Sequence, residues 1–195
     1  MRSHKLRLVL DPGHGGQSSG AVGSSGLAEK ELNLKLAFLL KDLLESKFQV
    51  FLTREGDVDV PLEERVRFAE SKEADIFISL HFNADALRNP NLTRTEVYFH
   101  FEESGPSMDL GELICEEFRS RLDIPCVGPI PSRYTVLKSK VPVRLLLECS
   151  YITNEEEERK LLKGKRLEEI SNIVGNALIK FSELDFCRYR GFEIK

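Results

Sequence analysis

Leu6-Arg-Leu-Val-Leu-Asp-Pro-Gly-His14 decides the fold prediction, because a short apolar run ends here in a histidine within a turn. Two later apolar runs, Ile76–Leu80 and Val143–Leu147, are followed directly by His81 and Glu148. Apolar runs of this length without clean alternation are typical of strands buried on both faces of a mostly parallel sheet. In such sheets, ligands bind at the carboxyl ends of the strands. We therefore expect these three polar side chains to lie along one edge of one sheet.

The rest of the chain alternates between strand and helix patterns. Further strands are predicted over residues 48–53, 75–81, 95–101 and 143–149, and helices over 29–46, 61–72, 106–122, from 155 onward and 167–184. This order predicts one α/β domain over residues 1–195, with a mostly parallel twisted sheet of five or six strands and helices on both faces.

Two segments of this pattern are less regular. In the strand over 95–101, Glu96, Tyr98 and His100 alternate with apolar residues, which predicts an exposed face toward the edge of the sheet. Residues 123–142 contain several prolines and are predicted to form a loop before the last strand.

The composition excludes several classes of function. A net charge of −4 leaves no basic stripe, so we expect no nucleic-acid partner. No apolar stretch approaches the roughly 20 residues that a membrane-spanning helix needs. Residues 1–5 lead straight into the first strand, and no secretory signal peptide is visible before it. We expect the protein to be a monomer.

The chain has four cysteines, Cys115, Cys126, Cys149 and Cys187, without any Cys-x-x-Cys spacing. Cys115 falls in a helical pattern and Cys149 at the end of a strand, where a cysteine usually acts as a small buried apolar residue. Nothing in the spacing selects a pairing. We therefore expect no structural disulfide.

His14 is a candidate metal ligand. Glycines on both sides, Gly13 and Gly15, let the backbone turn sharply and leave the imidazole unobstructed, which is an unusual place for a core histidine. The glycine-rich loop over residues 15–26 could also hold a phosphate, but it lacks the Lys and Ser/Thr of a P-loop. The metal interpretation is the stronger one.

His81 alone fits a core histidine as well as a ligand, but the prediction of His14 at the same edge favours a ligand. A third ligand should be a carboxylate, because His4 is in the N-terminal tail and His100 is on the polar face of a strand. Glu29 and Glu31 both open the first helix, and either could instead simply favour the helix N-terminus. These residues alone do not decide between the two.

Glu148 follows an apolar run that should be buried, and a buried carboxylate is costly unless it is paired or bound to a metal. Burial would raise its pKa and a nearby Zn²⁺ would lower it, which suits a general base. The acidic run Glu155–Glu158, which Asn154 precedes as a helix cap, is better explained by the helix macrodipole than by a metal cluster.

Together, these segments resemble the zinc-dependent N-acetylmuramoyl-L-alanine amidases, specifically the amidase-3 family of peptidoglycan hydrolases. The matching segments occur in the order of the family and span nearly the whole chain. They are Val9-Leu-Asp-Pro-Gly-His-Gly-Gly16, Gly26-Leu-Ala-Glu-Lys-Glu-Leu-Asn-Leu34, Leu52-Thr-Arg54, Ser79-Leu-His-Phe-Asn-Ala84, Glu96-Val-Tyr98 and Leu147-Glu-Cys-Ser-Tyr-Ile-Thr-Asn154.

The resemblance implies that residues 1–195 are an amidase-3-like catalytic domain with one Zn²⁺ per chain. His14, Glu29 and His81 correspond to the zinc ligands, and the Gly-x-x-Glu-Lys context selects Glu29 over Glu31. Glu148 corresponds to the catalytic glutamate. The implied reaction is hydrolysis of the amide between N-acetylmuramic acid and the L-alanine of the peptidoglycan stem peptide. The implied location is the cell envelope, either the periplasm or the extracellular wall.

Two departures from the family affect the expected substrate site. Cys149 stands after the catalytic glutamate where the family usually has glycine, which would add a side chain beside the general base. Some relatives carry a long insertion with a helix that blocks the zinc, and no such segment fits between His81 and Glu148. We therefore expect an accessible site, flanked by the loops over 15–27 and 83–94.

Two other functions compete with this one. The chain could be a Cys–His hydrolase with Cys149 as nucleophile and His81 as base, although no orienting residue is evident. It could also be a non-catalytic module that binds peptidoglycan. The presence of all four expected site residues argues against the second alternative.

Overall fold

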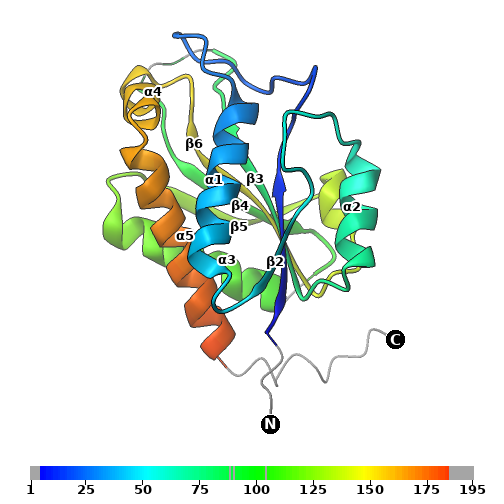
Figure 1. Ribbon diagram of the computed structural model, residues 1–195. Coiled ribbons are helices and arrows are strands. Elements are labelled where there is room, and N and C mark those ends of the chain that lie inside the picture. The colour runs from blue at the N-terminus through cyan, green and yellow to red at the C-terminus, as the bar shows by residue number, and fades with distance from the viewer. Residues whose placement is uncertain (1–4, 88, 90, 104, 185–195) are drawn as a thin grey trace.

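The three apolar runs form adjacent strands of a six-stranded sheet in the computed structural model, which describes residues 5–87, 89, 91–103 and 105–184 (Figure 1). The strand order across the sheet is β2-β1-β3-β6-β4-β5. The strands are β1 (Arg7–Pro12), β2 (Gln49–Leu52), β3 (Ile76–Asn83), β4 (Thr95–His100), β5 (Cys126–Ser132) and β6 (Val143–Tyr151).

Strands β2, β1, β3 and β6 are parallel, so β1, β3 and β6 end at the same edge. Ile76 of β3 lies between Leu8 of β1 and Val143 of β6, which places the three apolar runs side by side. Strand β4 is antiparallel to β6, and β5 is parallel to β4. The predicted α/β class and mostly parallel sheet are confirmed.

Helices cover both faces of the sheet, as predicted (Figure 1). They are α1 (Glu29–Leu44), α2 (Leu62–Ser71), α3 (Pro106–Arg121), α4 (Glu155–Leu162) and α5 (Lys165–Glu183), with a short 3₁₀ helix, η1 (Thr135–Lys138). Helices α1, α3 and α5 pack on one face over the larger apolar core, to which Leu8 and Leu10 contribute. The opposite face carries α2 and η1 over a smaller cluster that contains Val9 and Phe77. Alternate residues of each central strand thus contribute to two separate apolar cores, one on each face of the sheet.

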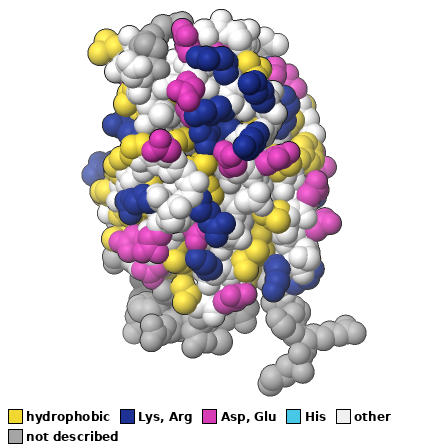
Figure 2. Space-filling model, turned by 90° about the vertical axis from the view of Figure 1, so that its left-hand side faces the viewer, with side chains coloured by type: hydrophobic (Ala, Val, Ile, Leu, Met, Phe, Trp, Pro, Cys, Tyr) yellow, Lys and Arg dark blue, Asp and Glu magenta, His cyan; other side chains and the backbone are white. Residues whose placement is uncertain are grey.

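The outer surface on the left of Figure 1, where α4 and α5 lie, is charged (Figure 2). Lys and Arg side chains gather on the upper half of this face, and Asp and Glu side chains lie between and below them.

The acidic start of α4 is capped as predicted, because the Asn154 side chain accepts a hydrogen bond from the Glu157 N–H at 2.9 Å.

The predictions for β4 and β5 were partly wrong. β4 lies between β6 and β5, not at the edge, and Glu96 and His100 are buried. The edge strand on this side of the sheet is β5, which comes from the segment that we predicted to be a proline-rich loop and contains Pro129 and Pro131. Proline is tolerated in an edge strand because the outward N–H positions there have no ladder partner.

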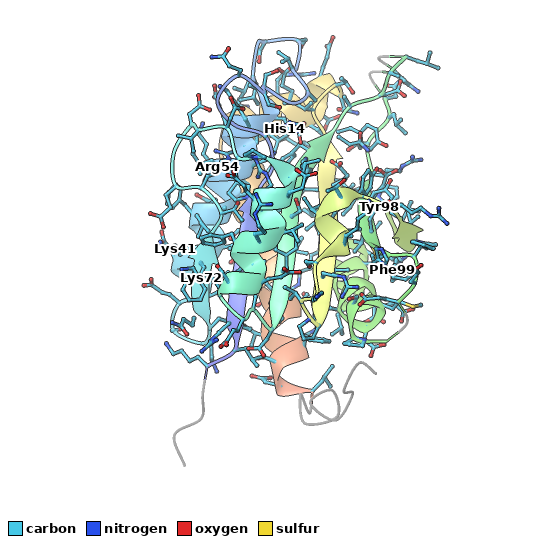
Figure 3. All side chains as sticks on the ribbon, turned by 90° about the vertical axis from the view of Figure 1, so that its right-hand side faces the viewer. His14, Lys41, Arg54, Lys72, Tyr98 and Phe99 are labelled. Atoms are coloured by element: carbon cyan, nitrogen blue, oxygen red, sulfur yellow. A yellow bond between two sulfur atoms is a disulfide. The ribbon has the colours of Figure 1, made fainter. Side chains whose placement is uncertain are left out.

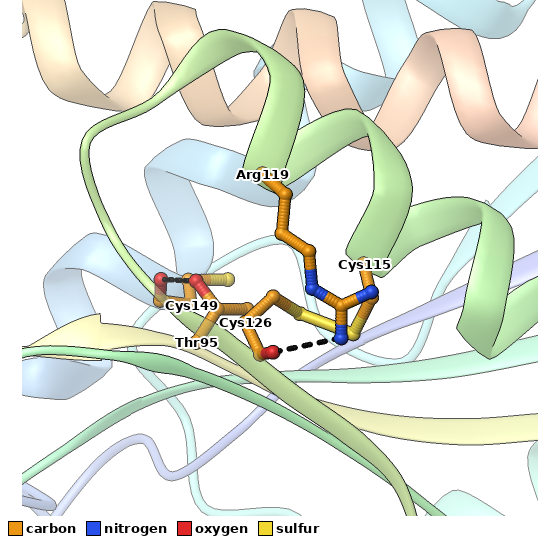
Figure 4. The surroundings of a disulfide bond; sticks show 5 residues. All are labelled: Thr95, Cys115, Arg119, Cys126 and Cys149. Carbon is orange, nitrogen blue, oxygen red and sulfur yellow. Dashed lines mark hydrogen bonds between the residues drawn. A yellow bond between two sulfur atoms is a disulfide. The ribbon is translucent and has the colours of Figure 1, made fainter.

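The prediction of no disulfide was also wrong, because Cys115 of α3 and Cys126 of β5 form one, with their Cα atoms 5.2 Å apart (Figure 4). The Arg119 guanidinium donates to the Cys126 carbonyl at 3.0 Å beside it. Only the packing of α3 on β5 creates this pair, so no sequence spacing could reveal it. Cys149 is a free, fully buried thiol as expected, and Cys187 lies outside the described residues.

Candidate metal centre

The carboxyl ends of the three central strands bring His14, His81 and Glu148 to one edge of the sheet. Strand β1 pairs with β3 up to Pro12, two residues before His14. His81 and Glu148 are direct register partners on β3 and β6. Their juxtaposition follows from the parallel register of these strands, as the sequence predicted.

Glu29, the first residue of α1, lies between the two histidines. Its Oε2 atom is 3.2 Å from His14 Nε2, and its Oε1 atom is 2.8 Å from His81 Nδ1. The imidazole rings meet edge to face, with centroids 5.0 Å apart. One donor atom from each of the three residues lies within 4.8 Å of the other two. Figure 3 shows His14 at the upper end of the sheet.

Several groups fix the Glu29 carboxylate in this place. The Ala21 N–H donates to Oε2 at 2.8 Å, and the Phe82 N–H donates to Oε1 at 3.2 Å. The Asn33 side chain, one turn along α1, donates to Oε1 at 3.3 Å. Glu29 is buried, whereas Glu31 is exposed. The structure therefore brings Glu29, and not Glu31, to the histidines.

The electrostatics of this group favour an ionised carboxylate. Burial raises the pKa of Glu29, but the hydrogen bonds from His14 and His81 outweigh that effect and hold the pKa far below its ordinary range. Burial lowers the pKa of His81, but the hydrogen bond to Glu29 and the Glu148 charge raise it above its ordinary value. The two imidazoles thus stabilise the ionised carboxylate of Glu29 at this edge of the sheet.

The donor set fits a divalent cation. Two imidazole nitrogens and one carboxylate oxygen are the three-ligand set of many catalytic zinc sites. The side chains of His14 and His81 are 28% and 18% exposed, so the centre is open to solvent, in agreement with the expected access. Among the described residues, this is the group of three that could hold a metal; it does not include His100, and His4 lies outside the described residues.

Two glycines allow the close approach of these side chains. A Cβ atom on Gly13 would lie 2.2 Å from His81 Cε1. A Cβ atom on Gly20 would lie 2.4 Å from Glu29 Oε2 and 2.6 Å from His14 Cδ2. Any larger residue at either position would therefore displace a member of the centre.

Ser18 orients the His14 ring, and sequence reasoning missed it. Its Oγ atom is 2.9 Å from His14 Nδ1, which leaves Nε2 facing Glu29. A hydrogen bond to the second ring nitrogen of a metal-binding histidine fixes the ring orientation and tautomer. The turn that carries Ser18 is closed by a bridge between Gly15 and Ser18, so the contact is local.

Glu148 lies beside this group, as the register partner of His81. Its Oε2 atom is buried and has no hydrogen-bond partner among the described residues. Burial raises the pKa of Glu148 to about 7, with His81 opposing the shift and the charges of Glu29 and Glu96 adding to it. A carboxylate with a pKa near neutrality can both accept and return a proton.

Glu96 is a buried carboxylate next to Glu148 in the sheet register, and the predicted exposed face hid it from sequence reasoning. It accepts hydrogen bonds from four side chains: Arg94 Nε at 2.5 Å, Asn83 Nδ2 at 2.8 Å, the Tyr98 hydroxyl at 3.0 Å and the Tyr151 hydroxyl at 3.2 Å. The charge of Glu96 is therefore compensated by these hydrogen bonds, whereas Glu148 Oε2 has no such partner among the described residues.

The glycine-rich loop is held to α4 by Glu158. This buried carboxylate accepts from the N–H and hydroxyl groups of both Ser24 and Ser25, at 2.6–3.1 Å. Glu157 is buried as well and pairs with Arg166 at 2.9 Å. The acidic run thus does more than favour a helix N-terminus, and its members do not join the group of potential metal ligands.

Cys149 is unsuited to act as a nucleophile. It is fully buried in the larger core, on the opposite face of β6 from Glu148, and burial raises its pKa well above the ordinary value. A reactive cysteine needs a lowered pKa and access to substrate. The Cys–His hydrolase alternative therefore has no support, and the Cys149 side chain does not lie beside the carboxylate of Glu148.

Comparison with known proteins identifies the family. The Amidase_3 family model, described as N-acetylmuramoyl-L-alanine amidase, matches residues 8–180. This chain belongs to the amidase-3 family. Among curated relatives, N-acetylmuramoyl-L-alanine amidase LytC of Bacillus subtilis is 32% identical over 176 residues, which cover 89% of this chain and 35% of LytC. N-acetylmuramoyl-L-alanine amidase AmiA of Escherichia coli is 30% identical, over 91% of this chain and 76% of AmiA.

A solved amidase-3 relative has the same fold. N-acetylmuramoyl-L-alanine amidase AmiC2 of Nostoc punctiforme superposes with a TM-score of 0.84 at 32% sequence identity, covering 93% of this chain and 99% of that chain. The amidase-3 family is metal-dependent and acts on cell-wall peptidoglycan. This chain spans about a third of the length of LytC.

Proposed function

We propose that residues 1–195 form an amidase-3 catalytic domain that hydrolyses the amide between N-acetylmuramic acid and L-alanine in peptidoglycan. In this proposal, His14, Glu29 and His81 hold one zinc ion, and Glu148 is the general base. The observation that carries it is the buried Glu29 carboxylate, which contacts both imidazoles while Glu148 lies beside His81 on the neighbouring strand.

Zinc bound by these three residues would lower the pKa of a water molecule and polarise the scissile carbonyl. The protein residues supply the rest of the chemistry. The Glu148 carboxylate accepts a proton from the attacking water and returns it to the leaving amide nitrogen. Burial raises the pKa of Glu148 and a bound zinc ion would lower it, and these opposing effects suit a group that makes both transfers. Ser18 and the Phe82 N–H keep His14 and Glu29 in place during turnover.

The proposed substrate also leads to proposals for the binding groove, the cellular location and the oligomeric state of the domain. The glycan and stem peptide would lie between the loops over 15–27 and 83–94, and the domain would work in the cell envelope as a monomer. None of the helices in the described part of the chain combines the length and apolar character needed to cross a bilayer. The amidase proposal requires no partner protein or nucleic acid.

A non-catalytic peptidoglycan-binding module is the second candidate. Such a module would need only a groove for the glycan and peptide. In this chain, however, a metal-type donor set lies beside a carboxylate with one buried oxygen that has no hydrogen-bond partner among the described residues, at an energetic cost that binding alone does not require. The amidase is therefore the better-supported function.

Digestion of purified sacculi tests the proposal. We expect the protein to release stem peptides with a free N-terminal L-alanine, which mass spectrometry identifies. A chelator should abolish release, and added zinc should restore it. Binding to sacculi without release, in the presence of zinc, would instead support the binding module.

A second prediction separates Glu29 from Glu31. Glu29→Ala should weaken zinc binding and abolish turnover, because its carboxylate contacts both histidines. Glu31 is exposed, so Glu31→Ala should cost only roughly 0.3–1 kcal/mol of stability through the helix dipole, with activity nearly unchanged. Zinc content and amidase rate of the two variants decide the assignment. Losses that fell on Glu31 would contradict it.

A further inference from the structure

Two buried arginines hold the turn that carries His14. Arg54 donates from Nε to the Pro12 carbonyl at 2.9 Å and from Nη2 to the Gly13 carbonyl at 3.0 Å. Arg65 donates from Nη1 to the Pro12 carbonyl at 2.7 Å and from Nη2 to the His14 carbonyl at 2.8 Å. Three consecutive carbonyl groups of the turn are thus bound by two guanidinium groups. Figure 3 shows Arg54 close to His14 at this end of the sheet.

The turn needs such support because His14 has a left-handed backbone, with φ of 60°. A residue with a Cβ atom is disfavoured in this conformation. It persists only where the surroundings over-determine it, and such positions cluster at functional sites. The conformation directs the imidazole toward Glu29, so a relaxed turn would move the Nε2 atom away from its 3.2 Å contact.

The arginines are themselves anchored to elements around the centre. Arg65, on α2, pairs at 2.7 Å with the fully buried carboxylate of Asp11, which also accepts from Thr53 and Ser79. Arg54 also donates to the Lys30 carbonyl in the first turn of α1 at 2.8 Å. The two arginines, which we call the clamp, therefore connect the ends of the strands with α1, whose first residue is Glu29.

Burying two arginines lowers the stability of the fold, so a purely structural role does not explain this arrangement. Both arginines are only 3% exposed, and Asp11 is the carboxylate that pairs with Arg65. Burial, followed by the charge of Arg65, lowers the pKa of Arg54. Neutral groups could bind a turn without burying two cations beside each other. Two guanidinium forks instead impose a fixed geometry on several carbonyls, since each fork presents rigid, planar donors.

We propose that Arg54 and Arg65 are positioning residues for the metal centre, which set the place of His14 by clamping the carbonyls of Pro12, Gly13 and His14. The inference rests on the proposed metal site and extends it to residues that touch neither metal nor substrate. Asn33 strengthens the connection, because its side chain donates both to the Gly13 carbonyl at 3.1 Å and to Glu29 Oε1 at 3.3 Å.

The test compares Arg54→Lys and Arg65→Lys with Arg144→Lys in the full chain. Lysine keeps the charge but cannot bind two carbonyls with a planar fork. Arg144 is a matched control, because it is buried and donates to the carbonyls of Leu137 and Val141 at 2.7 and 2.8 Å, outside the metal centre. Zinc affinity is measured by competition with a chromogenic chelator, and ligand geometry by the visible absorption spectrum of the cobalt(II)-substituted protein.

We expect Arg54→Lys and Arg65→Lys to weaken zinc binding by about 10–100-fold, the usual effect of losing outer partners of metal ligands, and to change the cobalt spectrum. Arg144→Lys should lower the melting temperature of the metal-free protein while zinc affinity and the cobalt spectrum stay as in the wild type. Thr53→Val, which removes one hydrogen bond to Asp11, provides a milder variant if Arg65→Lys does not fold. It should shift the spectrum in the same direction.

Two results would overturn the inference, and they are distinguishable. Wild-type zinc affinity and an unchanged cobalt spectrum in folded Arg54→Lys and Arg65→Lys, or in Thr53→Val where it replaces Arg65→Lys, would remove the positioning role and leave the proposed amidase intact. A wild-type protein that binds no zinc would remove the metal centre, and with it both proposals. Equal losses of zinc affinity in the clamp variants and in Arg144→Lys would show a general effect of stability, which also contradicts the inference.

Discussion

Replacing Glu148 by glutamine is expected to lower the amidase rate by roughly 10²–10⁴-fold, the usual effect of losing a general base, while one zinc per chain stays bound. Glutamine keeps the size and the hydrogen-bonding capacity of the side chain but cannot take a proton from water. Zinc should remain because the donor group is formed by His14, Glu29 and His81 without Glu148. Release of stem peptide from sacculi and zinc content are measured on the same samples.

The stability of this variant separates catalysis from folding. Burial raises the pKa of Glu148 from the ordinary 4.5 to about 7. A raised carboxyl pKa contributes stability that is fully present below pH 4.5 and is lost as the pH rises through about 7. Above that pH the buried carboxylate is a cost that glutamine removes, so metal-free Glu148→Gln should melt no lower than the wild type at about pH 8.

Glu117→Gln is the matched control, since Glu117 is a buried glutamate on α3, outside the metal centre. It should keep full activity even if it loses stability with its ion pairs to Lys180 and Arg121. Near-normal hydrolysis by Glu148→Gln, or loss of its zinc, would show that Glu148 is not the base.

Removal of the histidines should abolish metal binding. His14→Ala is expected to lose most of its zinc and its activity, because two protein donors cannot hold the ion as three do. The fold should survive, since the large core over α1, α3 and α5 does not include His14. Zinc content by elemental analysis and secondary structure by circular dichroism check the two parts of this prediction.

The double variant His14→Ala/His81→Ala gives the sharper result. It leaves Glu29 as the only one of the three donors, so we expect zinc in no more than trace amounts. His100→Ala is the control, because His100 is a buried histidine on β4 outside the group of donors. Stoichiometric zinc in the double variant would place the metal elsewhere in the protein.

The residues of the candidate metal centre were largely predictable because the carboxyl ends of neighbouring parallel strands lie at the same edge of a sheet. Once three buried apolar runs are assigned to one parallel sheet, the residues that follow them must meet at one edge. His14, His81 and Glu148 follow such runs, and the structure brings them together. Glu29 was different, since both Glu29 and Glu31 open the same helix and only the family resemblance distinguished them.

Other features depend on contacts that leave no periodic signal. Cys115 and Cys126 pair because α3 packs on β5, and β5 itself could not be recognised among its prolines. Glu96 falls at a polar position of an alternating strand, yet the insertion of β4 between β6 and β5 buries it. Sequence alternation indicates which residues share a face of a strand, but not what covers that face.

The sequence alone therefore determined the α/β class, the strands that carry the site and the chemical character of the centre, because short-range apolar patterns specify strands and strand ends collect ligands. The family resemblance selected Glu29 over Glu31 and the structure agrees, whereas only the tertiary structure showed which arginines support the turn that carries His14. Arg54 follows β2 and Arg65 lies on α2, and their guanidinium groups converge on one turn only in the folded protein. Long polar side chains gain specific partners through such packing, and no local pattern encodes the partner in advance.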